Sequence, residues 1–397
     1  MLEFIQEKSK CTGCGACASI CPTGSISFAY DDEGFAYPEA DSTCIDCGKC
    51  YNVCPVLNYS ASAKTRFKQF CVAARHVDHS VWEKSSSGGA FSAICKAYCN
   101  DGDVIFGAKF EDLKVVHDYV CSPDEIGGFM KSKYVQSDLR DNYHKTKRML
   151  ESNRRVLFSG TPCQIAGLRS FLERDYSNLL CIDLICHGVG SPGIFQEYVN
   201  YLEAKYGSKV TSFTFRNQKL KMWQFFDHII RVDFENGTTI EDGADLYNTG
   251  FIQCLFLRPS CSECKFANLS RVGDITLGDF RNQYELLPEL RGSGNLSTII
   301  VNTEKGNEVF NLLGQYMNIY FVPMEDVINM SLQLREPSPM SENREEFFSD
   351  LLSGIPIEQA LKNHVVVNSP GLTRRIWLMI PGRVRARIKR QIKWIRK

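Results

Sequence analysis

Eight cysteines in the first 54 residues form the most informative pattern in the sequence. The pattern C-x2-C-x2-C-x3-C-P occurs twice, at Cys11, Cys14, Cys17 and Cys21 and again at Cys44, Cys47, Cys50 and Cys54. This spacing is typical of chains that bind two 4Fe-4S clusters, where the last cysteine of each run ligates the other cluster. We therefore expect cluster I to take Cys11, Cys14, Cys17 and Cys54, and cluster II to take Cys44, Cys47, Cys50 and Cys21.

Zinc sites and disulfides are the alternative uses of these eight thiols. Zinc sites normally draw their four ligands as two pairs, rather than as two runs that end in Cys-Pro. Disulfides form in oxidising compartments, and the first ten residues lack the apolar segment of a secretory signal. The sequence contains no run of 18 apolar residues, so it predicts no membrane-spanning helix. We expect a cytoplasmic protein whose N-terminal module is of the ferredoxin type and transfers single electrons.

Three turns farther along the chain lead from a predicted strand or loop into a helix. Such turns present free N–H groups and the positive end of the helix dipole, which suits a phosphate, although serines there also serve as ordinary helix caps. In an open α/β sheet, turns that follow strands also form the ligand crevice. The residues concerned are Ser85, Ser86, Ser87, Gly88 and Gly89 in the first turn, Gly160 and Thr161 in the second, and His187 in the third.

Four further cysteines lie in loops or at element ends, and together they are enough for a third cluster if the fold brings them together. They are Cys163, Cys186, Cys261 and Cys264. Scattered cysteines specify a site less than a tight run does, so their spacing alone leaves this question open. The remaining six are best interpreted as small buried side chains, namely Cys71, Cys95, Cys99, Cys121, Cys181 and Cys254.

The elements that must position these residues alternate between short apolar runs and helical patterns. We expect strands at 70–74, 104–110, 155–158, 179–185, 210–215, 275–277 and 298–301, and helices at 91–99, 162–172, 192–206 and 305–316. Asn236-Gly237 predicts a hairpin between 228–234 and 238–241. The predicted fold class is α+β or α/β: a small ferredoxin module, a larger body with a mixed sheet, and a helical C-terminal tail.

Several strings of the body resemble, in order, the coenzyme F-420 hydrogenase/dehydrogenase beta-subunit family. They are Ser85–Gly89, Ser132–Ser137, Ser159–Gln164, Leu184–Gly188, Cys261-x-x-Cys264 and Asp274–Asp279. The resemblance implies a bound FAD with contacts from Ser85–Gly89 and from Lys133, Tyr134, Gln136 and Ser137, together with Gly160 and Thr161. It also implies a third 4Fe-4S cluster on Cys163, Cys186, Cys261 and Cys264. Beyond Asp279 we find no string of this family.

The domains expected on this basis are a two-cluster ferredoxin module at 1–57, a linker at 58–69 and a flavin and iron–sulfur catalytic domain at 70–325. A helical extension at 326–372 and a basic tail at 373–397 follow.

The parts together predict an iron–sulfur flavoprotein oxidoreductase. Electrons would pass from ferredoxin or a similar donor through the clusters to FAD, which exchanges single electrons for a hydride, and then to a small-molecule or lipid-linked substrate. His187 would protonate that substrate or only hydrogen-bond a cofactor. Proteins that resemble this layout also occur in bacterial surface-polysaccharide biosynthesis, and that resemblance implies one possible substrate class. The alternatives are deazaflavin (coenzyme F-420) oxidoreduction and an electron-transfer subunit without a substrate of its own; tetrapyrrole reduction is less favoured.

The net charge of zero hides a basic C-terminus. Residues 374–397 hold ten Lys or Arg and no acidic residue, which leaves 36 basic against 46 acidic residues in the rest of the chain. Val384, Ile388, Ile392 and Ile395 recur on one face of a predicted helix. Such a helix suits the inner face of the cell membrane, and we expect peripheral contact there rather than nucleic-acid binding. The alternative is docking on the protein's own acidic body.

Overall fold

The computed structural model describes residues 2, 5, 7–58, 67–217, 229–281, 286–290 and 294–366. Most of the predicted linker (59–66) and the whole basic tail, with its predicted amphipathic helix, lie outside the described residues. Within the described ranges, no helix is both long and apolar enough to cross a bilayer.

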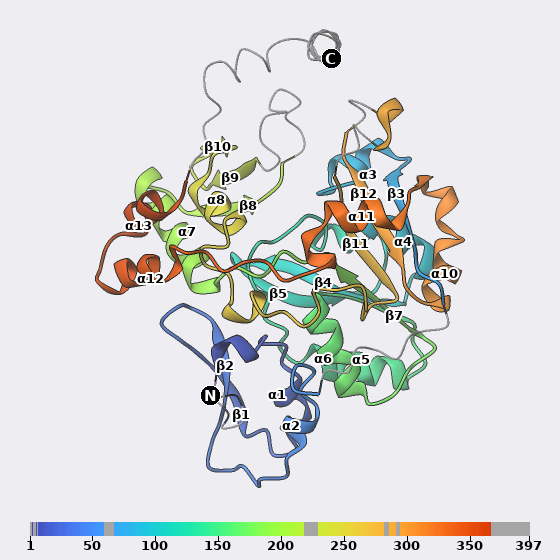
Figure 1. Ribbon diagram of the computed structural model, residues 1–397, viewed down its shortest axis with the longest axis horizontal. Helices are drawn as coiled ribbons and strands as arrows, with labels where there is room; N and C mark the ends of the chain where they lie inside the picture. Colours follow the sequence, from blue (N-terminus) through green and yellow to red (C-terminus); the bar gives the residue numbers. More distant parts are fainter. Residues whose placement is uncertain are drawn as a thin grey trace, which may run out of the picture.

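An eight-stranded mixed sheet forms the centre of the molecule (Figure 1). Its strand order is β13-β3-β12-β11-β7-β6-β4-β5, and the four strands from β11 to β4 run parallel while the outer pairs are antiparallel. The bounds are β3 (Phe70–His76), β4 (Val104–Glu111), β5 (Lys114–Val120), β6 (Val156–Ser159), β7 (Leu179–Leu184), β11 (Ile275–Phe280), β12 (Leu296–Val301) and β13 (Met317–Phe321).

Helices cover both faces of this sheet, because successive strand residues point to opposite sides. In β3, Val72 and Ala74 pack with α4 (Ala90–Tyr98) and α10 (Glu304–Phe310), whereas Cys71 and Ala73 pack with α11 (Met324–Met330) on the other face. The same second face holds α5 (Asn142–Glu151) and α6 (Pro162–Leu172) over β4, β6 and β7. The sheet therefore separates α4 and α10 from α5, α6 and α11.

Local sequence fixes where the two longest helices of the described residues begin. In α6, Thr161 and Gln164 form a reciprocal capping box and Pro162 occupies the first turn, where its missing N–H is not needed. In α7 (Pro192–Tyr206), the Ser191 side chain accepts from Ile194 N and Pro192 again opens the helix. Both predicted starts are therefore where the structure has them.

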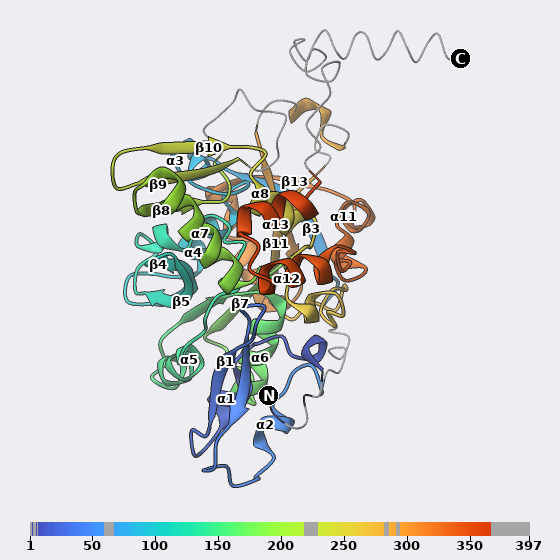
Figure 2. The same cartoon turned by 90° about the vertical axis from the view of Figure 1, so that its left-hand side faces the viewer.

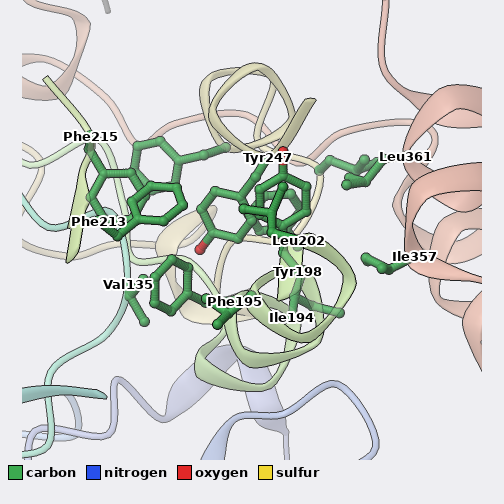
Figure 3. Close-up of a cluster of buried hydrophobic side chains, with 14 of the residues drawn as sticks. Val135, Ile194, Phe195, Tyr198, Leu202, Phe213, Phe215, Tyr247, Ile357 and Leu361 are labelled. Atoms are coloured by element: carbon green, nitrogen blue, oxygen red, sulfur yellow. The ribbon is translucent and has the colours of Figure 1, made fainter. Parts of the chain in front are cut away.

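A second core joins α7 to a three-stranded antiparallel sheet of order β10-β9-β8 and to the last described helices. Figure 3 shows Phe195 and Tyr198 of α7 between Phe213 on one side and Leu361 on the other. The elements are β8 (Val210–Thr214), β9 (Ile230–Phe234), β10 (Thr239–Asp242), α8 (Leu246–Ile252), α12 (Arg344–Leu352) and α13 (Ile357–His364). The predicted hairpin is thus β9–β10.

The N-terminal module consists of one antiparallel pair, β1 (Ile26–Tyr30) with β2 (Ala36–Ala40), and two short helices, α1 (Ala16–Ile20) and α2 (Lys49–Asn52). Both views show it below the body, next to α5 and α6 (Figures 1 and 2). Helix α1 packs against α2, α5 and α6. The predicted mixed α/β fold with a small ferredoxin-like module and C-terminal helices is confirmed.

The remaining described helices are short, and the predicted end of the helix at 305–316 is wrong. They are η1 (Lys8–Lys10), α3 (His79–Glu83), η2 (Ile126–Gly128), η4 (Pro259–Cys261), η5 (Pro288–Leu290), η6 (Leu313–Gln315) and η7 (Leu332–Leu334). The helix expected at 305–316 ends at Phe310, and η6 then turns the chain into the edge strand β13. The apolar residues that follow Phe310 therefore serve a turn and a strand.

Candidate iron–sulfur and flavin site

Four cysteines of the predicted cluster I line one hollow in the N-terminal module. The cysteines in its lining are Cys11, Cys14, Cys17 and Cys54. Gly13 and Gly15 curl the backbone between them at φ of 66° and 77°, which glycine adopts without strain. Burial raises the pKa of Cys17 to about 12, and Cys11 and Cys54 add to that rise. Four converging thiols around a space of this kind fit a 4Fe-4S cluster, whose binding would release their protons.

The second cysteine run lies at the surface. Cys44 and Cys47 are exposed, and so is Ile45 between them, at 62% of its full area. Burial raises the pKa of Cys50, with contributions from Cys47 and Cys44, so these three thiols interact. Cys21 ends α1, which packs on the α2 helix that carries Cys50. The described hydrogen-bond partners of the Cys21 thiol are Thr23 and Ser25, so the structure groups three of the four predicted ligands directly.

The four scattered cysteines of the body come together. Burial raises the pKa of Cys186 well above the usual thiol range, and Cys261, Cys163 and Cys264 each add to it. The same is true of Cys261, whose pKa burial raises to about 12 with contributions from Cys163 and Cys264. Three separate segments thus deliver a four-thiol set: the start of α6, the end of β7 and the loop around η4.

The three sets follow one another in space. Burial raises the pKa of Cys14, and one of the neighbouring thiols that add to this rise is Cys163 of the body. Cys17 has the corresponding interaction with Cys50 of the second run. Glycine at position 167 of α6 lets Cys14 come close to the body, because a Cβ there would lie only 3.1 Å from the Cys14 Sγ. Electrons could therefore pass in the order second run, first hollow, body set.

A buried ion pair braces the body set. Asp183 at the end of β7 and Arg271 in the loop after Cys264 are 0% and 1% exposed, and their side chains meet at 3.0 Å. The Arg271 guanidinium also donates to Phe266 O at 3.1 Å and to Leu184 O at 2.7 Å. This pair holds the loop with Cys264 against the strand that leads to Cys186.

Among the described residues, no three or more His, Cys, Asp or Glu side chains are arranged to hold a single metal ion. A four-iron cluster spreads its thiolates more widely around its corners than one ion does.

Two of the predicted flavin segments contact each other. Ser132 N donates to Ser86 Oγ at 2.6 Å, and the two hydroxyl oxygens lie 3.1 Å apart. Gly88 N donates to Ser297 Oγ at 2.9 Å, and a Cβ at Gly88 would lie 2.2 Å from Ala74 O. Only glycine fits there, so the turn is pressed against β3 and β12 just before α4.

A hydrogen-bonded chain links Ser137 to the α6 turn. The Ser137 hydroxyl lies 2.8 Å from His117 Nδ1 and accepts from Gln164 Nε2 at 3.0 Å. Gln164 Oε1 in turn accepts from Thr161 N at 3.0 Å. Burial lowers the pKa of His117 to about 4, so its ring is neutral near pH 7. The Ser137 and Thr161 segments are thus held together next to Cys163.

Three other predicted flavin residues are engaged by the protein itself. Lys133 Nζ donates to Gly128 O, Met130 O and Lys131 O at 2.7, 2.9 and 3.2 Å, which uses all three of its donors. The Tyr134 ring stacks on Phe251 with centroids 4.5 Å apart. The Gln136 amide bonds to Thr12 O and to Arg258. These side chains brace the segment, and its contacts with a flavin would come from backbone groups and serines.

His187 is held by partners on both ring nitrogens. Nε2 lies 3.2 Å from Phe251 O and 3.5 Å from Cys254 Sγ, while Nδ1 lies 3.4 Å from Ser338 Oγ. Burial lowers the pKa of His187. A neutral, fixed ring next to Cys186 fits the hydrogen-bonding interpretation as well as the proton-donor one.

The sequence interpretation missed the residues that join the module to the body. Arg258 is 1% exposed and binds Cys11 O, and Arg344 makes two 2.6 Å contacts with Glu33 at the tip of the β1–β2 hairpin. Ser191 Oγ donates to Glu33 O at 2.6 Å, next to the close Gly34–Gly193 approach. Isolated arginines carry no spacing signal, which is why only the fold reveals them.

Comparison with known proteins gives two family matches. The family model for the C terminus of the coenzyme F420 hydrogenase/dehydrogenase beta subunit matches residues 153–327, and the model for the 4Fe-4S dicluster domain matches residues 10–58. No curated protein matched the chain. Among solved structures, a chain of the F420-reducing NiFe hydrogenase complex from Methanosarcina barkeri aligns at 16% identity and a TM-score of 0.41, over 74% of this chain and 91% of that one.

The resemblance inferred from the motifs is confirmed by these two family matches. The chain is an iron–sulfur electron-transfer oxidoreductase related to coenzyme F420 hydrogenase beta subunits, with a 4Fe-4S dicluster domain at its N-terminus.

Proposed function

We propose that the chain carries electrons from an external low-potential donor such as ferredoxin, through three 4Fe-4S clusters, to a flavin beside which a substrate is reduced or oxidised. The observation that carries this proposal is the gathering of Cys163, Cys186, Cys261 and Cys264 next to the Cys14 side of the first hollow. Two clusters in the N-terminal module can deliver electrons to a site in the body only if a further redox centre lies between them and that site.

The side on which electrons arrive is the second cysteine run. Cys44 and Cys47 are the exposed cysteines among the eight, so a donor can approach them closely. Cys11 and Cys14 are buried against the body. This gradient of exposure runs from the surface toward the interior and supports the order of transfer, although either direction of flow is compatible with it.

The residues that would hold FAD are the backbone of Gly88 and Gly89, the hydroxyls of Ser86 and Ser137, and Thr161. Bound FAD would supply the exchange between single electrons and a hydride. The segment 134–136 also lies beside the body set, because Gln136 N donates to Gly190 O at 2.9 Å and Gly190 pairs with Leu257 before η4. The chain thus keeps the proposed flavin segment and the third cysteine set on adjacent stretches of backbone.

Iron, sulfide and flavin analysis of anaerobically purified protein tests this proposal. We expect about twelve irons and one FAD, as three four-iron clusters require. In Cys261→Ser the iron content should fall by about four, whereas Cys121→Ser, which removes a partly buried cysteine outside the three sets, should leave it unchanged. About eight irons in the wild-type protein would rule out the third cluster. Absence of flavin would overturn the proposed enzyme function.

Deazaflavin oxidoreduction is the second candidate, favoured by the family match over residues 153–327. Protein reduced with a measured amount of dithionite is mixed with coenzyme F-420, or with sugar-nucleotide or lipid-linked precursors of surface polysaccharide. Reoxidation by one of these identifies the substrate class. Reoxidation only by a protein partner would make the chain an electron-transfer subunit.

Contact of the 373–397 tail with a membrane is a separate proposal, and flotation of the protein with anionic vesicles tests it.

A further inference from the structure

Arg258 is a fully buried cation at the junction of the module and the body. Its guanidinium donates to Cys11 O at 2.7 Å, to Ala36 O at 3.0 Å and to Gln136 Oε1 at 2.9 Å. It also lies over the Tyr37 ring, 4.2 Å from its centroid. The described residues give it no carboxylate: its partners among them are carbonyls, an amide, aromatic rings and a thiol. A buried charge without a counter-ion is costly, and it is tolerated where another group supplies the negative charge.

Two cysteine sets face this cation. Nη2 lies 3.7 Å from Cys11 Sγ, within hydrogen-bond range for sulfur. On the other side, Arg258 is the residue just before η4, which ends at Cys261, and Cys261 N donates to Arg258 O at 2.9 Å. The guanidinium also donates to Gln136, whose backbone N–H donates to Gly190 O at 2.9 Å, close to the Cys186 segment. The guanidinium therefore stands between the first hollow and the body set.

We propose that Arg258 tunes two clusters of the relay at once: its buried charge raises the reduction potential of the cluster on Cys11 and that of the body cluster whose ligands include Cys261. This inference rests on the proposed function. Cluster potentials depend on local charge and on hydrogen bonds to the sulfurs. Reduction adds a negative charge to each cluster, and a fixed cation beside both stabilises the reduced form of both.

The test measures the midpoint potentials of the three clusters by EPR at poised potentials. Signals are assigned with the variant Cys261→Ser, which lacks the third cluster. In Arg258→Gln we expect the first and third clusters to become harder to reduce by at least tenfold in their reduction equilibrium, about 59 mV for one electron. The cluster of the exposed second run should move less and serves as the internal reference.

Arg344→Gln is the matched control. Arg344 is another buried arginine between module and body, but its described partners are Glu33, Leu257 O and the Phe348 ring. It should leave all three potentials within twofold of the wild-type equilibrium. Equal shifts in both variants would mean that Arg258 acts only through docking, and that result, or unchanged potentials in Arg258→Gln, would overturn the proposal.

Two further variants cover the case in which Arg258→Gln does not fold. Gln136→Glu places a carboxylate on the guanidinium without removing it, and it should shift the same two clusters in the same direction. Arg258→Lys keeps the charge but cannot maintain the forked contacts, so its shift should be smaller than that of the glutamine variant. No shift in Gln136→Glu would contradict the proposal. Fewer than twelve irons in the wild-type protein would instead refute the proposed function, which separates the two failures.

Discussion

The buried pair Asp183–Arg271 gives a sharp prediction about the body cysteine set. Asp183 Oδ1 accepts from Arg271 and, at 2.5 Å, from Thr276 Oγ1. Its Oδ2 accepts from the backbone N–H of Val272 and Gly273 at 3.2 and 2.9 Å. In Asp183→Asn, either orientation of the amide turns its NH2 group toward two donors and leaves Arg271 buried without a counter-ion.

The magnitude follows from burial. Both side chains are at most 1% exposed, so water cannot replace the lost contacts. Removing one partner of a buried ion pair costs about 3–5 kcal/mol. We expect that loss in the free energy of unfolding, followed by urea denaturation of the anaerobic holoprotein. Because the pair holds the loop with Cys264 to the strand before Cys186, the iron content should also fall, by up to the four irons of one cluster.

An exposed pair provides the control. Arg140 and Glu111 are 41% and 42% exposed, and an ion pair of this kind contributes about 0–1 kcal/mol. Glu111→Gln should therefore change neither stability by more than about 1 kcal/mol nor the iron content. If Asp183→Asn were no more destabilising than Glu111→Gln, the brace assigned to Asp183 would be wrong.

Two further predictions concern the docking of the module and the pH dependence of stability. Glu33→Gln should lower the free energy of unfolding by about 1.5–3 kcal/mol, the usual range for a hydrogen bond to a charged group. A double-mutant cycle with Arg344→Gln measures the coupling between the two side chains, and strictly additive effects would refute that coupling. Burial raises the pKa of Asp245 from 3.8 to about 6, against the hydrogen bond from Tyr198. A carboxyl group whose folded pKa is raised contributes stability below about pH 4 that is lost as the pH rises through about 6. In Asp245→Asn that decline should vanish from the dependence of thermal stability on pH between about pH 4 and 6, and an unchanged slope would contradict the assignment.

Local sequence patterns predicted the elements of the body well where a helix-start or turn signal marks their ends. Pro162 and Pro192 mark the starts of α6 and α7, and Asn236-Gly237 marks the β9–β10 turn. The edge strands β5 and β13 were missed. Lys114–Val120 mixes charged and apolar residues, and Met317–Phe321 followed a helical pattern that ran into it. Both are defined by pairing with β4 and β3, which is not a local property.

The residues of the candidate site also differ in whether a local sequence pattern identifies them. The eight N-terminal cysteines were predictable because a tight run constrains its own geometry. The body set needed the resemblance, since Cys163, Cys186 and Cys261 come from segments that only the sheet brings together. The role of Lys133 could not be predicted at all, because a lysine near a phosphate and a lysine capped by three carbonyls look alike in sequence.

The module is docked by contacts that leave it little freedom to move. A Cβ at Gly193 would lie 2.7 Å from the Gly34 Cα, so the two backbones are in close contact there. A Cβ at Gly167 would lie 3.1 Å from the Cys14 Sγ, so that side chain packs directly on α6. Arg258 and Arg344 add buried charged contacts across the same interface. A ferredoxin that meets its reductase by diffusion must form its interface at each encounter, at a rate that depends on concentration. Here folding forms that interface once. If the proposed function holds, transfer between the first hollow and the body set should be independent of protein concentration, and only the reaction of an external donor with the exposed second run should depend on it.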